Sequence, residues 1–264
     1  MTRRISRTQD FEINLHIKNE NFISTPRKTQ RDWVLNRAMK EFTSELVHLD
    51  QIALQFVAGA DAVDGLKDRK FRDLNDDEIM EDWQIPVMAE MAKIVTEKKG
   101  KVLEIGFGRG VASDLIQAAC PESHTIIECN PSVIKRYELW KKQFEDRNIC
   151  LVPGMWQDVI EELGQFDGIF FHTYPLSEID FVEQVVKSAT FAEHFFKVAS
   201  RHLNPGGVFT YLTNESDSLS REHQRALLRE FLRFEVSVVD NLGVPQDTKD
   251  AMWADSMVIV EARN

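Results

Sequence analysis

The sequence predicts an α/β domain with a seven-stranded, mostly parallel sheet that carries helices on both faces. From residue 101 onward, short apolar runs alternate with longer segments of helical periodicity, which is the pattern of successive βαβ units. Residues 166–171 are mostly apolar apart from Asp167, as expected for a parallel strand that helices cover on both sides. The final two apolar runs suit an antiparallel hairpin at one edge of the sheet.

The individual elements follow from the chain in order. A strand at residues 101–105 leads through a glycine turn into a helix at 110–119. A second strand, 124–129, precedes a helix at 132–145, which begins after Pro131, a residue well suited to a first helical turn. The remaining strands are predicted at residues 148–152, 166–172, 208–212, 235–239 and 257–262, and the remaining helices at 182–201 and 221–231. The long helix at 182–201 is expected to end before the turn-forming run Asn204-Pro-Gly-Gly207.

The first 75 residues lack this rhythm, and we expect them to form an N-terminal helical extension to a domain of residues 76–264. Apolar residues recur at helical spacing between residues 33 and 58, and residues 59–73 form a polar connector. The extension has three open interpretations: a packed appendage, the surface of a homodimer, or a lid that closes over a pocket.

Composition excludes several functional classes. The net charge of −11 argues against a general nucleic-acid binder, although basic residues outnumber acidic ones among the first 31 residues. Cys120, Cys129 and Cys150 show no C-x-x-C spacing and are expected to be reduced, buried thiols. No apolar run is long enough to span a bilayer, and the scattered histidines predict no metal site. We therefore expect a cytoplasmic protein without a nucleic-acid or membrane partner.

A ligand pocket is predicted where the first strand ends. Gly106, Gly108 and Gly110 occupy alternate positions after Glu104, whereas a dinucleotide fingerprint would read G-x-G-x-x-G. This spacing favours S-adenosylmethionine. That ligand carries an amino acid and no pyrophosphate, so the glycine turn that binds it must hold an ammonium and a carboxylate. Glu128 ends the second strand about 20 residues later, where it can accept two hydrogen bonds from a ribose diol.

A series of segments resembles guanidinoacetate N-methyltransferase and its arginine-methylating relatives. The resemblance covers about residues 78–215, and its most specific part is Thr173-Tyr-Pro-Leu-Ser-Glu178. It implies a class I, Rossmann-like methyltransferase that uses S-adenosylmethionine. The segments that carry it begin at Met80, Val102, Ile127, Gly154, Phe166, Thr173 and Asn204.

The resemblance also implies a set of cofactor contacts. Gly106, Phe107, Gly108 and Val111 would line the methionine end, Glu128 would hold the ribose with Asn130 beside it, Met155 and Trp156 would flank the adenine, and Met88 would close the cofactor from the preceding helix. Met80 is a further candidate beside Met88. Both methionines and Trp156 also suit ordinary core positions, so each of these assignments has a structural alternative.

The predicted acceptor site departs from the family. The family holds its guanidine with two carboxylates, and Gln84 and His172 occupy the matching positions here. A guanidinium, whose pKa is above about 12, stays protonated at neutral pH. Its methylation therefore needs a group that can take a proton. We therefore expect a different acceptor. A carboxylate could be oriented by a charged His172 with Gln84 and the Tyr174 hydroxyl, and a neutral nitrogen or a hydroxyl could use His172 as a base.

Further residues of the acceptor site are less specific. Thr173, Tyr211 and Asn214 are expected to contact the substrate, and Tyr174 joins His172 as a catalytic candidate. Glu215 or Glu178 could supply a lost acid from another direction, which would restore recognition of a guanidine.

The sequence thus predicts methyl transfer to a small molecule by direct displacement, with a nitrogen acceptor favoured and specialised metabolism as its setting. A carboxyl or hydroxyl O-methyltransferase is one alternative. A non-catalytic module that binds S-adenosylmethionine is the other.

Overall fold

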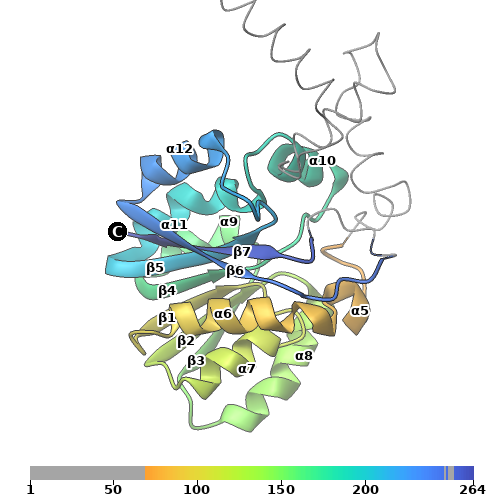
Figure 1. Ribbon diagram of the computed structural model, residues 1–264. Helices are drawn as coiled ribbons and strands as arrows, with labels where there is room; N and C mark the ends of the chain where they lie inside the picture. The colour runs from red at the N-terminus through yellow and green to blue at the C-terminus, as the bar shows by residue number, and fades with distance from the viewer. Residues whose placement is uncertain (1–68, 247, 249–252) are drawn as a thin grey trace, which may run out of the picture.

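The computed structural model describes residues 69–246, 248 and 253–264 (Figure 1). Within them, one seven-stranded sheet has the strand order β3-β2-β1-β4-β5-β7-β6. Strands β1 to β5 are parallel, and β7 is antiparallel to both of its neighbours, β5 and β6. The strands are β1 (Lys101–Ile105), β2 (Ser123–Glu128), β3 (Ile149–Pro153), β4 (Phe166–Phe171), β5 (Leu203–Thr213), β6 (Arg233–Val239) and β7 (Met257–Arg263). This arrangement confirms the predicted fold class, including the hairpin of β6 and β7.

Helices cover the sheet on both faces, as Figure 1 shows. The main helices of one face are α6 (Ile85–Val95), α7 (Val111–Ala118) and α8 (Pro131–Lys141), and those of the other are α9 (Trp156–Val159), α11 (Phe196–His202) and α12 (Arg221–Glu230). The shorter elements are α5 (Asp76–Ile79), η2 (Asp82–Gln84), η3 (Lys142–Phe144), η4 (Ile160–Glu162), α10 (Glu178–Phe181), η5 (Val182–Val186) and η6 (Phe191–Phe195).

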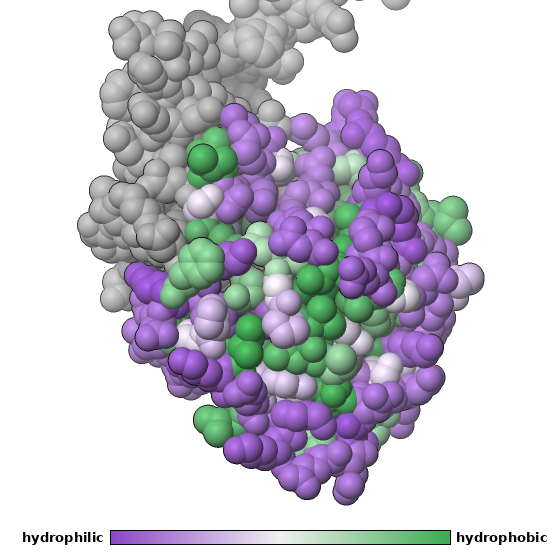
Figure 2. All heavy atoms as spheres, turned by 180° about the vertical axis from the view of Figure 1, so that it is seen from behind, coloured by the Kyte–Doolittle hydropathy of each residue, from purple (hydrophilic) through white to green (hydrophobic). Residues whose placement is uncertain are grey.

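Each face of the sheet has its own apolar core. On the α6 face, Met88 and Met91 pack with Val102 and Phe170, and all four side chains are almost completely buried. On the other face the core is largely aromatic, and Phe196 and Phe209 are at its centre. Seen from behind, apolar residues gather in the middle of the molecule within a border of hydrophilic ones (Figure 2). Burial on both faces fixes the strand register and so the place where each strand ends.

The predicted helix at residues 182–201 is wrong. The chain forms α10, the π-helical turn η5, the 3-10 turn η6 and α11 instead. The break lies near Thr190, whose backbone is extended, and the Glu193 carboxylate accepts a hydrogen bond from the Ala189 N–H at 2.7 Å. A side chain thus takes the donor that a continuous helix would have paired.

The predicted start of the fifth strand is also wrong. The run 204–207 lies inside β5, where the pairing with β4 shifts register between Phe166 and Gly168. The Gly206 N–H donates to the Asn264 carbonyl at 2.9 Å, so the chain end completes the pairing. Glycine and proline are tolerated at such an irregularity because the regular ladder is already interrupted.

The expectation of buried thiols fails for two cysteines. Cys120 and Cys150 are exposed, Cys129 is partly buried, and all three are free. Cys150 lies on β3, the outermost strand on its side of the sheet, which explains its exposure.

The N-terminal extension predicted for residues 1–75 lies mostly outside the described residues. In the described part of the chain, no helix is both long and apolar enough to cross a membrane.

Candidate functional site

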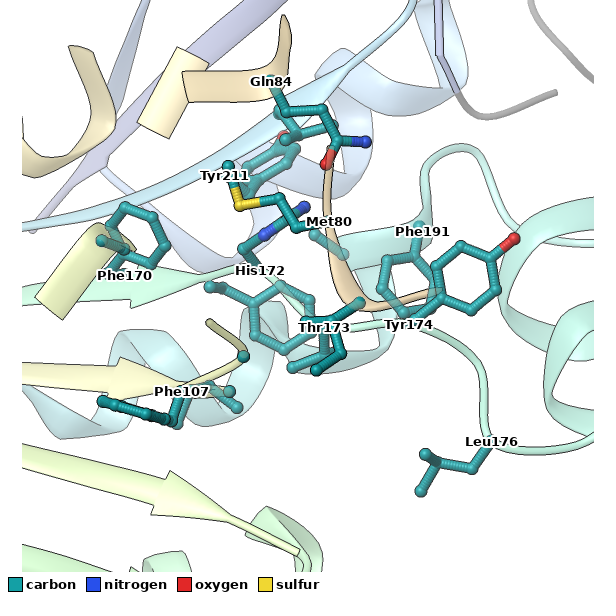
Figure 3. A pocket seen from close by; sticks show the side chains of 18 of the residues that line it. Met80, Gln84, Phe107, Phe170, His172, Thr173, Tyr174, Leu176, Phe191 and Tyr211 are labelled. Carbon is teal, nitrogen blue, oxygen red and sulfur yellow. The ribbon is translucent and has the colours of Figure 1, made fainter. Parts of the chain in front are cut away.

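A pocket of about 500 Å³ opens at the carboxyl ends of the parallel strands (Figure 3). It lies where β1 and β4 are neighbours and the chain turns to opposite faces after them, which is the usual ligand position in an open α/β sheet. Segments that follow β1, β2, β3, β4 and β5 all contribute to its wall. All the predicted site residues line this pocket: Gln84, Met88, Gly106, Phe107, Gly108, Val111, Glu128, Asn130, Met155, Trp156, His172, Thr173, Tyr174, Tyr211 and Asn214.

The glycine turn after β1 needs its glycines for conformation and for space. Gly106, Gly108 and Gly110 have φ angles of 89°, 56° and 83°, in the left-handed region that disfavours other residues. A Cβ on Gly106 would lie 2.7 Å from the His172 carbonyl oxygen. The turn then leads directly into α7, whose first residue is Val111.

Phe107 contributes its backbone to the pocket. Its side chain points into the core beneath α8, where its ring lies edge-on to Tyr137 and Trp140 with centroid distances of 5.5 and 5.3 Å. The backbone N–H of Phe107 donates to Glu128 Oε2 at 3.0 Å. The turn after β1 and the end of β2 are therefore linked by a direct hydrogen bond.

Glu128 is buried, and backbone donors surround its carboxylate. Besides the bond from Phe107, Oε1 accepts from the N–H groups of Cys129 and Asn130, each at 2.8 Å. Burial raises the pKa of Glu128 above its usual value, and the hydrogen bonds from the backbone act in the opposite direction. A carboxylate has about four acceptor positions, so ribose hydroxyls would share oxygens that the backbone already contacts.

Glu104 presents an unpaired acceptor at the same place. It is completely buried in β1, and the Ser113 hydroxyl donates to its Oε2. Its Oε1 is buried without a hydrogen-bond partner, and the residue lines the pocket beside the glycine turn. A buried acceptor without a donor is costly, so this oxygen suits a positively charged donor on a ligand.

Asn130 has a structural role in the described residues. Its Oδ1 accepts from the backbone N–H of Ser132 at 2.8 Å and so caps α8, while its Nδ2 donates to the carbonyls of Arg69 and Arg72. All polar atoms of the side chain are thereby engaged. A ligand contact at this residue would have to use its backbone.

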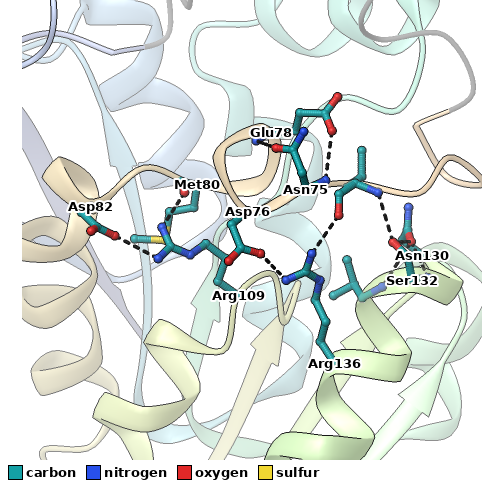
Figure 4. Close-up of polar contacts among 11 residues, drawn as sticks. Asn75, Asp76, Glu78, Met80, Asp82, Arg109, Asn130, Ser132 and Arg136 are labelled. Carbon is teal, nitrogen blue, oxygen red and sulfur yellow. Dashed lines mark hydrogen bonds and ion pairs between the residues drawn. The ribbon is translucent and has the colours of Figure 1, made fainter.

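The segment at residues 69–84 is held against the glycine turn by two arginines (Figure 4). Arg109, within the turn, pairs with Asp82 at 2.9 Å and donates to the Met80 carbonyl at 2.7 Å. Arg136 of α8 pairs with Asp76, and Asn130 anchors the start of the segment. These contacts place Met80 and Gln84 in the pocket wall.

Met88 and Trp156 lie at the junction of pocket and core. Met88 is 1 % exposed and belongs to the α6 core, so packing alone accounts for most of its surface. Trp156 begins α9, remains partly exposed and lies edge-on to Phe195 at 4.9 Å. Met155 precedes it as the N-cap residue. Trp156 thus has one surface against the core and one available to a ligand.

Gln84 and His172 face the pocket with different chemistry from the acids they replace. Gln84 Oε1 accepts the Glu81 N–H at 3.2 Å, which leaves its NH₂ as the group for a ligand. Burial lowers the pKa of His172 to about 4, so the imidazole is neutral near pH 7. Its ring centroid lies 6.0 Å from that of Trp253, and the two rings are edge-on. A carboxylate ligand would therefore have to raise the pKa of His172 before a charged imidazole could orient it.

The other acceptor candidates differ in availability. The Arg69 guanidinium lies 4.8 Å from the Tyr174 ring centroid, so one face of that ring is already covered. Thr173 follows His172, and its methyl group would lie 3.3 Å from a Cβ on Gly106. Tyr211 is 1 % exposed, packs in the aromatic core and bonds through its hydroxyl to His223. Asn214 lies beyond the end of β5 in the pocket wall.

Sequence reasoning missed the partners of Glu215. Its carboxylate lies 2.7 Å from His223 Nδ1, and His223 lies on α12, which the sequence offered no reason to connect with the pocket. The two residues share no recognised motif. The capping serine, Ser220, three residues before His223, is the only local signal.

Comparison with known proteins identifies relatives for most of this domain. The description of the guanidinoacetate N-methyltransferase family matches residues 58–249. Protein arginine N-methyltransferase 2 from Candida glabrata is 28% identical over 148 residues, covering 52% of this chain and 32% of the relative. The protein of the same name from Aspergillus oryzae is 34% identical over 111 residues, 40% of this chain and 26% of the relative. The chain thus matches about a third or less of the length of these relatives.

A solved structure supports the fold. Precorrin-6y C5,15-methyltransferase from Geobacter metallireducens superposes with a TM-score of 0.50 at 18% identity, covering 72% of this chain and 97% of the other. Identity at this level carries information about the fold alone.

Proposed function

Since the chain belongs to the guanidinoacetate N-methyltransferase family of S-adenosylmethionine-dependent methyltransferases, we propose that it transfers a methyl group to a nitrogen atom of a small-molecule acceptor. The observation that carries this proposal is the pocket itself. It combines the glycine turn and two buried acids, Glu104 and Glu128, with a neutral imidazole at His172. The cytoplasmic location stays a prediction from the sequence.

The residues present fit S-adenosylmethionine. Glu104 Oε1, which has no partner in the protein, suits the ammonium of the methionine end, and Glu128 suits the ribose hydroxyls. The backbone around Gly106 and Gly108 can approach the ligand closely because these residues lack a Cβ. Trp156 offers an apolar surface of the kind an adenine ring needs.

The cofactor would supply a methyl carbon that its sulfonium makes electrophilic. An acceptor nitrogen gives its lone pair to that carbon, the sulfur–carbon bond breaks with its electron pair going to sulfur, and one proton leaves the nitrogen. The chain's own residues align the acceptor and limit the access of water. His172 can accept a hydrogen bond from an acceptor N–H, because its imidazole is neutral.

A nitrogen acceptor fits these groups better than oxygen does. The carboxylate hypothesis needs a cation at His172, and burial lowers the pKa of that residue to about 4, so binding a carboxylate would have to include the cost of protonating the imidazole. A hydroxyl acceptor would need a strong base, and an imidazole with this pKa is a weak one. A heteroaromatic nitrogen carries a lone pair, and so does an amine once it has lost its proton, so either needs a weaker base than a hydroxyl does.

The names of the relatives favour a second candidate, an arginine side chain of a protein. Protein arginine N-methyltransferase 2 of two fungi matches this chain over 148 and 111 residues. Gln84 and His172 replace the acids expected for guanidine recognition, which weighs against the same acceptor.

The test uses purified protein with methyl-labelled S-adenosylmethionine. Guanidinoacetate, L-arginine and an arginine-containing peptide are offered beside small amines, heterocycles and carboxylates, and the products are treated with mild alkali. Alkali-stable label on nitrogen of a small molecule would support the proposal, and label on the peptide would favour the second candidate. Methanol released by alkali would indicate a carboxyl ester. Cofactor binding without transfer to any acceptor would indicate a non-catalytic module.

A further inference from the structure

Glu215, two residues beyond the end of β5, is a buried carboxylate in the wall of the pocket. The residue is 5 % exposed. Its Oε2 lies 2.7 Å from His223 Nδ1 and accepts the Ser220 N–H at 3.1 Å. Its Oε1 is buried and has no hydrogen-bond partner. One oxygen of this carboxylate is thus fixed by the protein, and the other lacks a donor.

The partners of Glu215 fix its orientation. His223 is completely buried, and its Nε2 is hydrogen-bonded to the Tyr211 hydroxyl. Burial raises the pKa of Tyr211 well above its usual value, so the hydroxyl keeps its proton. A chain of two buried side chains thus holds one oxygen of the carboxylate in place and leaves Oε1 without a donor.

A buried carboxylate oxygen without a donor is costly in a folded protein. Among the described residues, His223 is the single ion-pair partner recorded for Glu215. The arginines elsewhere in the pocket wall have partners of their own: Arg109 pairs with Asp82, Arg72 pairs with Glu78, and Arg69 donates to the Glu78 carbonyl. The unpaired oxygen is therefore best explained by a donor that arrives with a ligand.

Glu215 belongs to the acceptor side of the pocket. By register, Thr210 of β5 pairs with Phe170 of β4, so the ends of these strands and His172 lie at the same edge of the sheet. Glu104 and Glu128, which suit the cofactor, belong to β1 and β2 on the other side of β4. This separation leaves Glu215 as a carboxylate for the second ligand.

We propose that Glu215, positioned by His223 and Ser220, is the acidic recognition residue of the acceptor site and selects acceptors that carry a positive charge, guanidinium or ammonium. The inference rests on the proposed function, because it assigns one substrate feature to the same pocket. It also accounts for a pocket that has neutral side chains at Gln84 and His172. The anionic group is supplied from β5 in place of those two positions.

L-Arginine and L-citrulline provide a direct test, because they have nearly the same shape and only arginine is positively charged at the end of its side chain. Their affinities are measured by calorimetry with the full chain saturated with S-adenosylhomocysteine. We expect L-arginine to bind at least ten times more tightly than L-citrulline. Equal affinities, or no measurable binding of either, would overturn the inference.

Substitutions of Glu215 test whether this residue causes the preference for L-arginine over L-citrulline. Glu215→Gln should remove the tenfold preference for L-arginine while the affinity for S-adenosylhomocysteine stays unchanged. Glu215→Asp keeps the charge and should retain part of the preference, which guards against a folding defect in the first variant. Glu222→Gln, at an exposed position of α12, is the control and should behave as the unaltered protein. A preference that survives Glu215→Gln in folded protein would contradict the role of this residue.

These results are separable from the proposed function. A protein that prefers L-arginine through Glu215 and yet methylates no nitrogen compound would refute the proposed function and keep the inference. A protein that methylates nitrogen with no preference for charge would do the reverse.

Discussion

The carbonyl oxygen of His172 stands 2.7 Å from the position that a Cβ on Gly106 would occupy. The turn that suits the cofactor and the strand end that suits the acceptor are therefore in backbone contact. This contact is compatible only with glycine, because a methyl group would overlap a backbone atom that has no rotamer by which to move aside.

Gly106→Ala should damage both stability and cofactor binding. The substitution combines a φ of 89° with the overlap at His172, so we expect a loss of about 1–3 kcal/mol in the free energy of unfolding. Cofactor affinity should fall at least tenfold. Urea titration and calorimetry measure these changes. Gly164→Ala is the control, since nothing lies within 4 Å of its Cβ position, and an equal effect there would contradict the explanation.

Glu128→Ala should weaken the binding of S-adenosylmethionine by about 1.5–3 kcal/mol, the scale of hydrogen bonds to a charged group. The variant also loses the acceptor of the Phe107 N–H, so the turn after β1 should become less ordered. Calorimetric titration tests the first effect and hydrogen exchange at Phe107 the second. Cofactor affinity equal to that of the unaltered protein would exclude the ribose contact.

His172 should stay neutral throughout the physiological range. With its pKa lowered to about 4 by burial, its imidazole resonances should not shift between pH 8 and pH 5.5 in an NMR titration of the free protein. His172→Asn should reduce turnover with a nitrogen acceptor while leaving cofactor affinity intact. A titration midpoint near the ordinary histidine value would restore the carboxylate hypothesis.

Stability should fall as the pH drops below the ordinary histidine range. The pKa of His194 is lowered to about 4 by burial, whereas in the unfolded chain the imidazole binds its proton near the ordinary histidine pKa of 6.5. Between these two values the unfolded state holds more protons, so lowering the pH favours unfolding by up to about 1.4 kcal/mol per unit. His194→Phe should flatten this part of the curve of unfolding free energy against pH. An unchanged slope would argue against the lowered pKa.

Tyr211→Phe should leave the buried Nε2 of His223 without its hydrogen-bond partner. We expect a loss of about 1–3 kcal/mol in the free energy of unfolding, since a buried polar atom would lose its partner. The preference for a charged acceptor should weaken less than in Glu215→Gln, because Tyr211 acts through His223. Chemical denaturation and the arginine–citrulline comparison measure these two effects.

The sequence predicted the sheet well because its signal is local. Strand β1 coincides with the predicted residues 101–105, and β2 and β3 differ from prediction by one residue at each end. Apolar runs bounded by turn residues report burial directly, and burial on two faces leaves little freedom in register. The helices before β5 were harder, since the break near Thr190 depends on the Glu193 side chain.

The position of the pocket could be predicted from the sequence, but the side-chain contacts within its wall could not. Alternating glycines and a strand-end acid mark the cofactor side through local spacing alone, and their roles stay predictions. The hydrogen bond between Glu215 and His223 joins the loop after β5 to α12. The hydrophobic periodicity of the sequence gives no sign that these two residues are in contact. The lowered pKa of His172 likewise depends on what packs around it, including Trp253 from far along the chain.

The packing of Phe107 affects how such turns compare between proteins. Its side chain packs against Tyr137 and Trp140 of α8, so these residues constrain its size and shape, while the ligand would contact only its backbone. Residues at this position should therefore co-vary with the helix beneath the turn and tolerate changes of ligand. The residue type between the first two glycines should therefore report the packing of the neighbouring helix. It should not report which cofactor the protein prefers.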